Sequence, residues 1–117
     1  MSAARGILRA EGLALALISA GVVWQSGPPI WVVIAVLVAP DLTFAAYLVG
    51  PRAGAWAYNA AHSTIGPILV AGAGLVLGDR TTVEVALLWL VHVGADRALG
   101  FGLKGATFED THLGRLR

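Results

Sequence analysis

The sequence predicts an all-α protein, a four-helix antiparallel transmembrane bundle with a short polar C-terminal tail. Three observations predict it: a mainly apolar composition, four apolar runs of about membrane-spanning length, and short turn-forming connections. Hydrophobic residues make up 57 % of the 117 residues and charged residues 13 %, whereas an average soluble domain has about 25 % charged residues. A soluble chain of this length needs more polar side chains to cover its surface, so we expect lipid to cover this one.

The apolar runs define the predicted helices. Each run holds close to the ~20 apolar residues that cross a hydrocarbon core about 30 Å thick. The stretches QSGPP, GPRAG and GDR separate the runs, and connections this short make neighbouring helices antiparallel. We expect a single membrane domain over residues 1–117, with spans at about 7–24, 30–49, 53–77 and 83–103 and a cytoplasmic tail at 104–117.

The start of the first run is similar to a signal peptide. Arg5 and Arg9 precede LALALISAGVV, which is a basic-then-apolar pattern. Glu11 interrupts that pattern, and no small-x-small cleavage site precedes SGPP. We therefore expect a retained membrane anchor.

Basic residues predict the orientation of the bundle. Arg80 lies at the end that carries the QSGPP and GDR turns, and the other basic residues lie at the opposite end. The positive-inside bias places the more basic end in the cytoplasm, so we expect both termini there. The basic end comprises Arg5, Arg9, Arg52, Lys104, Arg115 and Arg117.

Composition and spacing exclude several function classes. The net charge is only +1, and no basic cluster with interleaved aromatic residues is present, which argues against nucleic-acid binding. The absence of cysteine excludes disulfides and thiolate metal ligands. GFGLKG at 100–105 matches a dinucleotide-binding glycine pattern, but that fingerprint requires a preceding strand. We expect these glycines to end the fourth span.

Each predicted span carries polar side chains near one depth, since sequence position converts into depth at 1.5 Å per residue. His92 and Asp96 are four residues apart and share a helix face, as do Tyr58 and His62. A charged residue at the centre of a span costs about 2.5 to 3.5 kcal/mol, so such residues turn inward and are functional candidates. The residues expected in the cytoplasmic half or at the midplane are Glu11, Asp41, Asn59, His62, His92 and Asp96.

Two prolines interrupt the hydrogen bonding of the predicted spans. Pro40 cannot donate to the carbonyl of Val36, and Pro67 cannot donate to that of Ser63. A kink beside Asp41 would free an acceptor for water or a side chain. The alternative is that both prolines only shape the packing.

Several ordered motifs are similar to those of a known family. The chain resembles the domain-of-unknown-function family four-two-six-zero (DUF4260) in PD at 40–41, GPRAG at 50–54, YNAAH at 58–62, HVGADRALGFGLK at 92–104 and THLG at 111–114. Phe101 stands where the family usually has a tyrosine, and Ala46 where it usually has a glycine. The resemblance implies a small, multi-pass, four-helix protein of the bacterial inner (cytoplasmic) membrane, and it implies no activity.

The ionisable residues suit a divalent transition metal: zinc, iron or manganese. A His-x-x-x-Asp pair on one helix presents two ligands on one face, as paired histidines do in zinc motifs. We predict His62, His92 and Asp96 as the ligands. Two alternatives stay open: a proton or polar-ligand site without metal, and a structural network in which His92, Asp96 and Arg97 satisfy one another.

The favoured hypothesis is a metal-dependent membrane enzyme that acts on a lipid or amphiphile arriving from the bilayer. The metal would activate water, with Asp41 or Glu11 as general base. The tail would fold over the mouth of the site, although a solvated terminus is the alternative. The expected polar-site or ligand-binding residues are Tyr58, Asn59, Arg97, Asp110 and His112.

The alternative hypothesis is a non-enzymatic role in proton or ligand handling, or as an accessory subunit of a larger membrane complex. Four short spans enclose too narrow a pathway for transport by a single copy, so transport would require a homo-oligomer. The expected partners are the lipid bilayer and either further copies or a larger membrane complex, and not nucleic acid.

Overall fold

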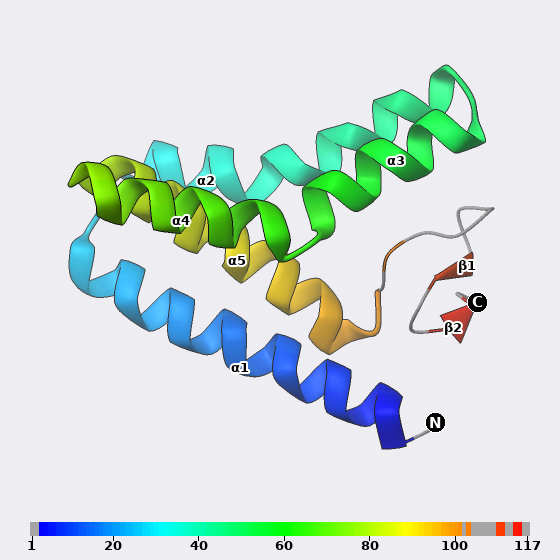
Figure 1. Cartoon of the computed structure of the whole chain (residues 1–117), viewed down its shortest axis with the longest axis horizontal. Helices are drawn as coiled ribbons and strands as arrows, with labels where there is room; N and C mark the ends of the chain where they lie inside the picture. The colour runs from blue at the N-terminus through cyan, green and yellow to red at the C-terminus, as the bar shows by residue number, and fades with distance from the viewer. Residues whose placement is uncertain (1–2, 102, 104–109, 112–113, 116–117) are drawn as a thin grey trace.

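The computed structural model describes residues 3–101, 103, 110–111 and 114–115. It is almost entirely helical, which confirms the all-α prediction. The four stretches 3–26, 30–48, 51–77 and 80–99 run in alternating directions (Figure 1). The elements are α1 (Ala3–Ser26), α2 (Ile30–Val38), the 3-10 helix η1 (Ala39–Leu48), α3 (Pro51–His62), α4 (Ile65–Leu77), α5 (Arg80–Leu99) and the paired two-residue strands β1 (Asp110–Thr111) and β2 (Gly114–Arg115).

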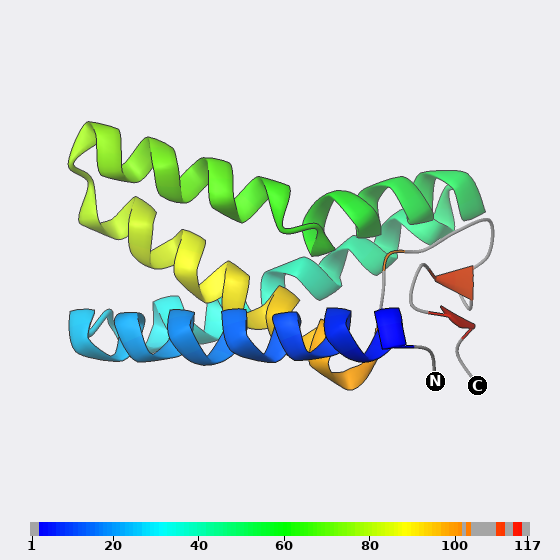
Figure 2. The same ribbon diagram turned by 60° about the horizontal axis from the view of Figure 1, so that its bottom comes forward.

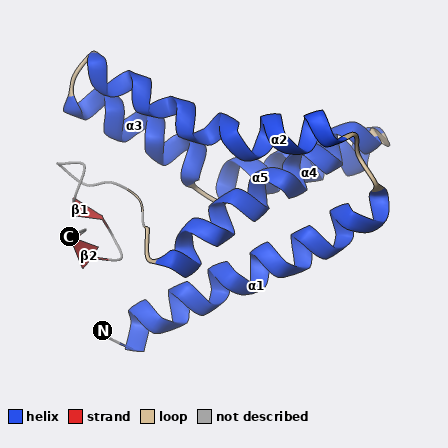
Figure 3. Cartoon of the chain, turned by 180° about the vertical axis from the view of Figure 1, so that it is seen from behind, coloured by secondary structure: helices blue, strands red, loops and turns tan. Residues whose placement is uncertain are grey.

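Helix α5 is the centre of the fold. It packs against α1, α4 and α2 and so joins segments that are distant in the sequence. Turning the molecule shows α1 and α4 on opposite sides of α5 (Figure 2). Helix α3 packs mainly on η1, and the two form a hairpin that extends beyond the other helices (Figures 1 and 3). The four-helix bundle is therefore not confirmed as such, because α3 pairs with η1.

Two helical segments are long and apolar enough to cross a membrane: α1 and the continuous segment Ile30–Leu48. Helices α3 and α4 meet the same criterion together and would form a third, bent span. Helix α5 is not among the segments that qualify within the described part of the chain; it carries Arg80, Glu84, Asp96 and Arg97. The structure supports a membrane protein, and the four-span topology stays a prediction.

The outer helices expose apolar side chains, whereas α5 is largely covered. Leu17 of α1, Ile34 of α2 and Val76 of α4 are 64 %, 58 % and 87 % exposed. Among the described residues of α5, only Leu99 is a large apolar side chain with such exposure, and Val93 is fully buried. Because its neighbours cover it, α5 does not need a lipid-compatible surface. It is thus the helix on which ionisable side chains are least costly.

The third apolar run forms two helices, where the sequence suggests one over 53–77. Helix α3 ends at His62, Ser63 is extended, and α4 begins at Ile65 with a bend of 42° between the two axes. Pro67 lies in the first turn of α4, where backbone N–H groups have no helical acceptor, so its missing N–H costs little. The helix expected to be interrupted at Pro67 is thus fully broken before it, between His62 and Ile65. The break leaves the last carbonyls of α3 without helical N–H partners.

The second interruption lies at Pro40. Helix α2 changes there into the 3-10 helix η1, which begins at Ala39. In a 3-10 helix each N–H bonds to the carbonyl three residues earlier, and Pro40 has no N–H for the carbonyl of Leu37. The Leu37 carbonyl is therefore available to a side chain from another helix.

Local signals set the two ends of α5. The side chain of Asp79 accepts a hydrogen bond from the Thr81 N–H at 3.1 Å and caps the start of the helix. The helix ends at Leu99 because Gly100 adopts a left-handed conformation with φ of 96°, which favours glycine. The prediction that glycines end this helix is confirmed, although the end lies at Leu99 and not at Leu103.

Polar side chains join α1 to α5 at the end of the molecule that carries the α4–α5 turn. Ser26 donates to the Glu84 carboxylate, and Arg80 donates to the carbonyl of Ser26 and, at 3.0 Å, to its hydroxyl. Arg80 Nε also lies 3.5 Å from Glu84 Oε2. Glu84 is only 6 % exposed, and these partners offset the cost of burying its charge.

Helices α1 and α5 approach closely at Gly12 and Gly94. A Cβ on Gly12 would lie 2.2 Å from the Cβ of Arg97 and 2.8 Å from the carbonyl oxygen of Gly94. A Cβ on Gly94 would lie 2.5 Å from the carbonyl oxygen of Gly12. Small residues allow such close packing between membrane helices. This contact fixes the half of α5 that carries Asp96 and Arg97.

The substitution Gly12→Ala tests this packing. We expect it to lower the thermal unfolding midpoint of the detergent-solubilised protein, because overpacking typically costs about 1–3 kcal/mol. Gly21→Ala on the same helix is the matched control, since a Cβ there meets nothing within 4 Å. It should leave the midpoint unchanged or raise it, because alanine is the better helix former. Equal midpoints for the two variants would contradict the close contact.

Candidate functional site

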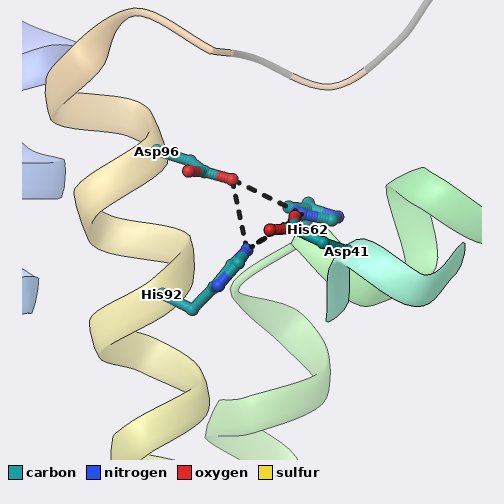
Figure 4. Close-up of side chains that lie close together, drawn as sticks. All are labelled: Asp41, His62, His92 and Asp96. Carbon is teal, nitrogen blue, oxygen red and sulfur yellow. Dashed lines mark hydrogen bonds and ion pairs between the residues drawn. The ribbon is translucent and has the colours of Figure 1, made fainter. Parts of the chain in front are cut away.

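Four polar side chains from three separate segments meet beside α5: Asp41 from η1, His62 from the end of α3, and His92 and Asp96 from α5. One ligand atom of each lies within 4.8 Å of those of all the others. Figure 4 shows the four side chains pointing toward one another. We refer to these residues as the His–Asp cluster. All four were predicted to lie near one depth, and the structure brings them together.

The separations within the His–Asp cluster are short and nearly uniform. His62 Nε2 lies 3.2 Å from Asp41 Oδ1 and 3.4 Å from Asp96 Oδ2. His92 Nε2 lies 3.2 Å and 3.3 Å from the same two oxygens. The two Nε2 atoms lie 3.1 Å apart. Each imidazole therefore faces both carboxylates and the other imidazole through the same nitrogen.

Backbone carbonyls fix the orientation of both imidazoles. His62 Nδ1 donates to the carbonyl of Tyr58 at 2.9 Å, and His92 Nδ1 donates to that of Leu37 at 2.6 Å. Since a carbonyl only accepts hydrogen bonds, each Nδ1 carries the proton. In the neutral rings the lone pair then lies on Nε2 and points into the His–Asp cluster. Metal-binding histidines are commonly held by a carbonyl at the other ring nitrogen in this way.

The arrangement favours a positive charge within the His–Asp cluster. Two unprotonated nitrogens 3.1 Å apart have no hydrogen to share, and the neighbouring carboxylate oxygens are also acceptors. Without a positive charge, four electron-rich atoms would repel one another in a partly buried site. Either a bound metal ion or an added proton on an imidazole removes this repulsion.

The separations around the two imidazole nitrogens match those between ligands of a zinc ion. Ligands at about 2.0–2.1 Å from a central zinc ion lie roughly 3.3 Å from one another. The separations that involve the two imidazoles span 3.1 to 3.4 Å. The two imidazole nitrogens and either carboxylate oxygen therefore have the mutual separations of three ligands on one ion.

The His–Asp cluster is buried on one side and open on the other. The side chains of His62 and His92 are 1 % and 9 % exposed, and that of Asp96 is 21 % exposed. Asp41 is 53 % exposed. A ligand would thus reach the centre past Asp41, while both imidazoles stay fixed.

Neighbouring groups support His62. The ring of Tyr58 stacks on the imidazole with centroids 3.8 Å apart, and Phe44 packs against Tyr58 with centroids 5.3 Å apart. Arg97 donates through Nη2 to the carbonyl of His62 at 3.1 Å. Trp89 donates through Nε1 to the carbonyl of Ala61 at 2.5 Å. Two of the carbonyls freed at the end of α3, those of Ala61 and His62, are therefore occupied, and the end of the helix is held in place.

The remaining predicted residues lie around or away from the His–Asp cluster. Tyr58 and Arg97 contact His62, as described above, and Asn59 is half-buried on α3. Glu11 is exposed on α1 and is not part of the cluster. Asp110 lies in β1, and the prediction for His112 falls outside the described residues. A role of the tail over the site stays a prediction.

Sequence reasoning missed the groups that orient the imidazoles. The carbonyl of Leu37 and the side chain of Trp89 were not predicted to take part, and Tyr58 was predicted for its side chain and not for its carbonyl. One signal was present, because Pro40 indicates a free carbonyl nearby. Its location at Leu37 and not at Val36 follows from the 3-10 geometry of η1.

Replacing Trp89 by Phe tests the hydrogen bond from Trp89 to the carbonyl of Ala61. The change removes the donor to the Ala61 carbonyl, and an unsatisfied buried acceptor costs about 1–3 kcal/mol. We expect a lower thermal unfolding midpoint for Trp89→Phe. Trp56→Phe is the matched control, because Trp56 is 74 % exposed, and its midpoint should match that of the wild type. A Trp89→Phe protein as stable as this control would show that the hydrogen bond is dispensable.

The chain matches one known protein family. The family model described as Domain of unknown function (DUF4260) matches residues 5–116, nearly the whole chain, which confirms the resemblance seen in the motifs. No curated protein and no solved structure matches the chain. The chain belongs to the DUF4260 family.

Proposed function

We propose that this protein is a membrane enzyme that binds a divalent transition metal at His62, His92 and Asp96 and uses it to activate water. One observation carries the proposal: two carbonyl-oriented imidazoles present their Nε2 atoms 3.1 Å apart, facing the same carboxylates. With both imidazoles neutral, no hydrogen lies between these groups and the arrangement directs lone pairs at one point. That donor geometry is typical of a metal centre.

The donor set favours zinc among the candidate metals. Imidazole nitrogen suits zinc and iron, while manganese prefers sites rich in oxygen ligands. Zinc takes four ligands in a tetrahedron, which agrees with the separations of 3.1 to 3.4 Å. Two imidazoles and one carboxylate with an open position also suit iron(II). Elemental analysis distinguishes the two metals directly.

Asp41 is the residue best placed to act on a metal-bound water. A catalytic zinc site has three protein ligands and keeps the fourth position for water or substrate. Asp41 is the most exposed member of the His–Asp cluster, at 53 %. If His62, His92 and Asp96 held the metal, the Asp41 carboxylate would lie within reach of a metal-bound water and could accept its proton as general base. The exposed position of Glu11 on α1, outside the His–Asp cluster, does not support the same role for Glu11.

The substrate is proposed to be a lipid or amphiphile that reaches the site from the bilayer. The outer helices expose apolar side chains, and Asp41 lies on the Ile30–Leu48 segment, which is apolar enough to span a membrane. With α5 as a fourth span, the positive-inside rule would place both termini in the cytoplasm, and the site would then open toward the inner leaflet. A substrate from that leaflet would approach past Asp41.

A proton relay is the second candidate, because the same contacts connect an exposed Asp41 to the buried His62. In that case one imidazole carries an added proton in place of the metal. A relay predicts proton flux into liposomes that contain the wild-type protein, with no bound metal, and loss of that flux in Asp41→Asn. Flux at the level of empty liposomes for both proteins eliminates the relay.

Removing one imidazole tests the metal centre. We expect the wild type, purified without chelator, to hold stoichiometric zinc in inductively coupled plasma mass spectrometry. His92→Asn should lower the zinc affinity by more than the ~10–100-fold that loss of an outer-shell partner causes. Glu11→Gln is the matched control, because it changes an ionisable residue outside the His–Asp cluster and should keep the zinc.

A second substitution tests whether Asp41 is a metal ligand or a general base. Asp41→Asn should retain zinc if His62, His92 and Asp96 are the ligands. Helical circular dichroism and a single size-exclusion peak confirm that each variant is folded. The proposal fails if the wild type binds no zinc, iron or manganese, or if folded His92→Asn binds as much metal as the control.

A further inference from the structure

An apolar groove adjoins the His–Asp cluster. It has a volume of about 400 Å³, within the range of ~300–1,000 Å³ typical of small-molecule sites. Ala35, Val36, Ala39, Pro40 and Thr43 form one wall from α2 and η1, and the opposite wall comprises Ala61, Val85 and Trp89. Ala35 and Ala39 are exposed, so the groove opens sideways between the helices toward the surface that faces lipid.

The polar groups in these walls are bonded to one another. Thr43 Oγ1 donates to the carbonyl of Pro40 at 2.7 Å, and Trp89 Nε1 donates to that of Ala61 at 2.5 Å. Gly66 permits this position of Trp89, since a Cβ there would lie 2.6 Å from the indole. The groove thus presents methyl, methylene and aromatic surface, which suits a hydrocarbon and not a polar ligand.

The groove and the His–Asp cluster are neighbours along α5. Val85, Trp89, His92 and Asp96 follow one another at intervals of four, three and four residues, which places them on one helix face. On the opposite wall Asp41 directly follows Pro40. The groove therefore lies beside the proposed metal ligands, and its lining residues do not include the ligands themselves.

We infer that the groove binds the alkyl chain of an amphiphilic substrate whose polar group lies at the His–Asp cluster; this rests on the proposed function and names its substrate class. One turn of a partner helix is about 10–12 Å wide with side chains and about 5.4 Å long, so it would take up at least the whole groove volume of about 400 Å³. A single hydrocarbon chain fits this volume and the inert lining. The small side chains of Ala35 and Ala39 leave the lateral entrance open to it.

Photo-labelling tests the inference. The probe is a fatty acid with a diazirine near the end of its chain, added to zinc-loaded protein in phosphatidylcholine nanodiscs. Mass spectrometry should locate adducts on Val85 and Trp89 in preference to Leu69 and Val76, which are exposed on α4. An excess of unlabelled fatty acid should suppress the adducts on α5. Equal labelling of α4 and α5, without competition, would mean ordinary lipid contact and would overturn the inference.

A variant that fills the groove provides a second test by photo-labelling. Ala39→Phe should reduce the α5 adducts several-fold, because the ring occupies the entrance. Ala45→Phe is the matched control: it lies on η1, is exposed, and does not line the groove. Unchanged labelling in Ala39→Phe overturns the inference. Metal content is measured in every sample, so saturable labelling without any bound metal would reject the proposed function and leave the chain-binding groove standing.

Discussion

The structure depends on how two imidazoles are held by the backbone. Each Nδ1 donates to a carbonyl, at Tyr58 and at Leu37, and so each Nε2 faces the centre of the His–Asp cluster. A carbonyl inside a regular helix is already bonded to the N–H four residues later. The Leu37 carbonyl is available because η1 is a 3-10 helix that contains Pro40. The irregular backbone is therefore part of the site and not a defect in packing.

The position of α5 explains how a membrane protein accommodates these groups. The surrounding helices expose apolar side chains, which lets α5 carry Asp96, Arg97 and His92 in a covered position. Gly12 and Gly94 bring α1 against α5 near this end, while Ser26 and Glu84 join the two helices at the other. The break before α4 then places His62 opposite His92. Helix packing and the geometry of the His–Asp cluster are thus determined by the same contacts.

Much of this organisation could be predicted from the sequence, because it follows from hydropathy and spacing. The apolar runs locate the helices, Gly100 ends α5, and the depth of Asp41, His62, His92 and Asp96 brings them together. Other features depend on tertiary structure. The pairing of α3 with η1 and the exposure of Glu11 depend on how each helix is rotated, and hydropathy does not determine that rotation. The carbonyl partners depend on backbone bonds that side-chain patterns do not reveal.

The central claim is that the imidazoles of His62 and His92 and the carboxylate of Asp96 coordinate one metal ion. X-ray absorption spectroscopy at the zinc edge of the loaded protein tests this claim most directly. We expect nitrogen and oxygen scatterers at about 2.0–2.1 Å from the zinc. We also expect the multiple-scattering signal that comes from the outer ring atoms of coordinated imidazoles. A spectrum without that imidazole signal, typical of zinc bound by water and carboxylates alone, would contradict it.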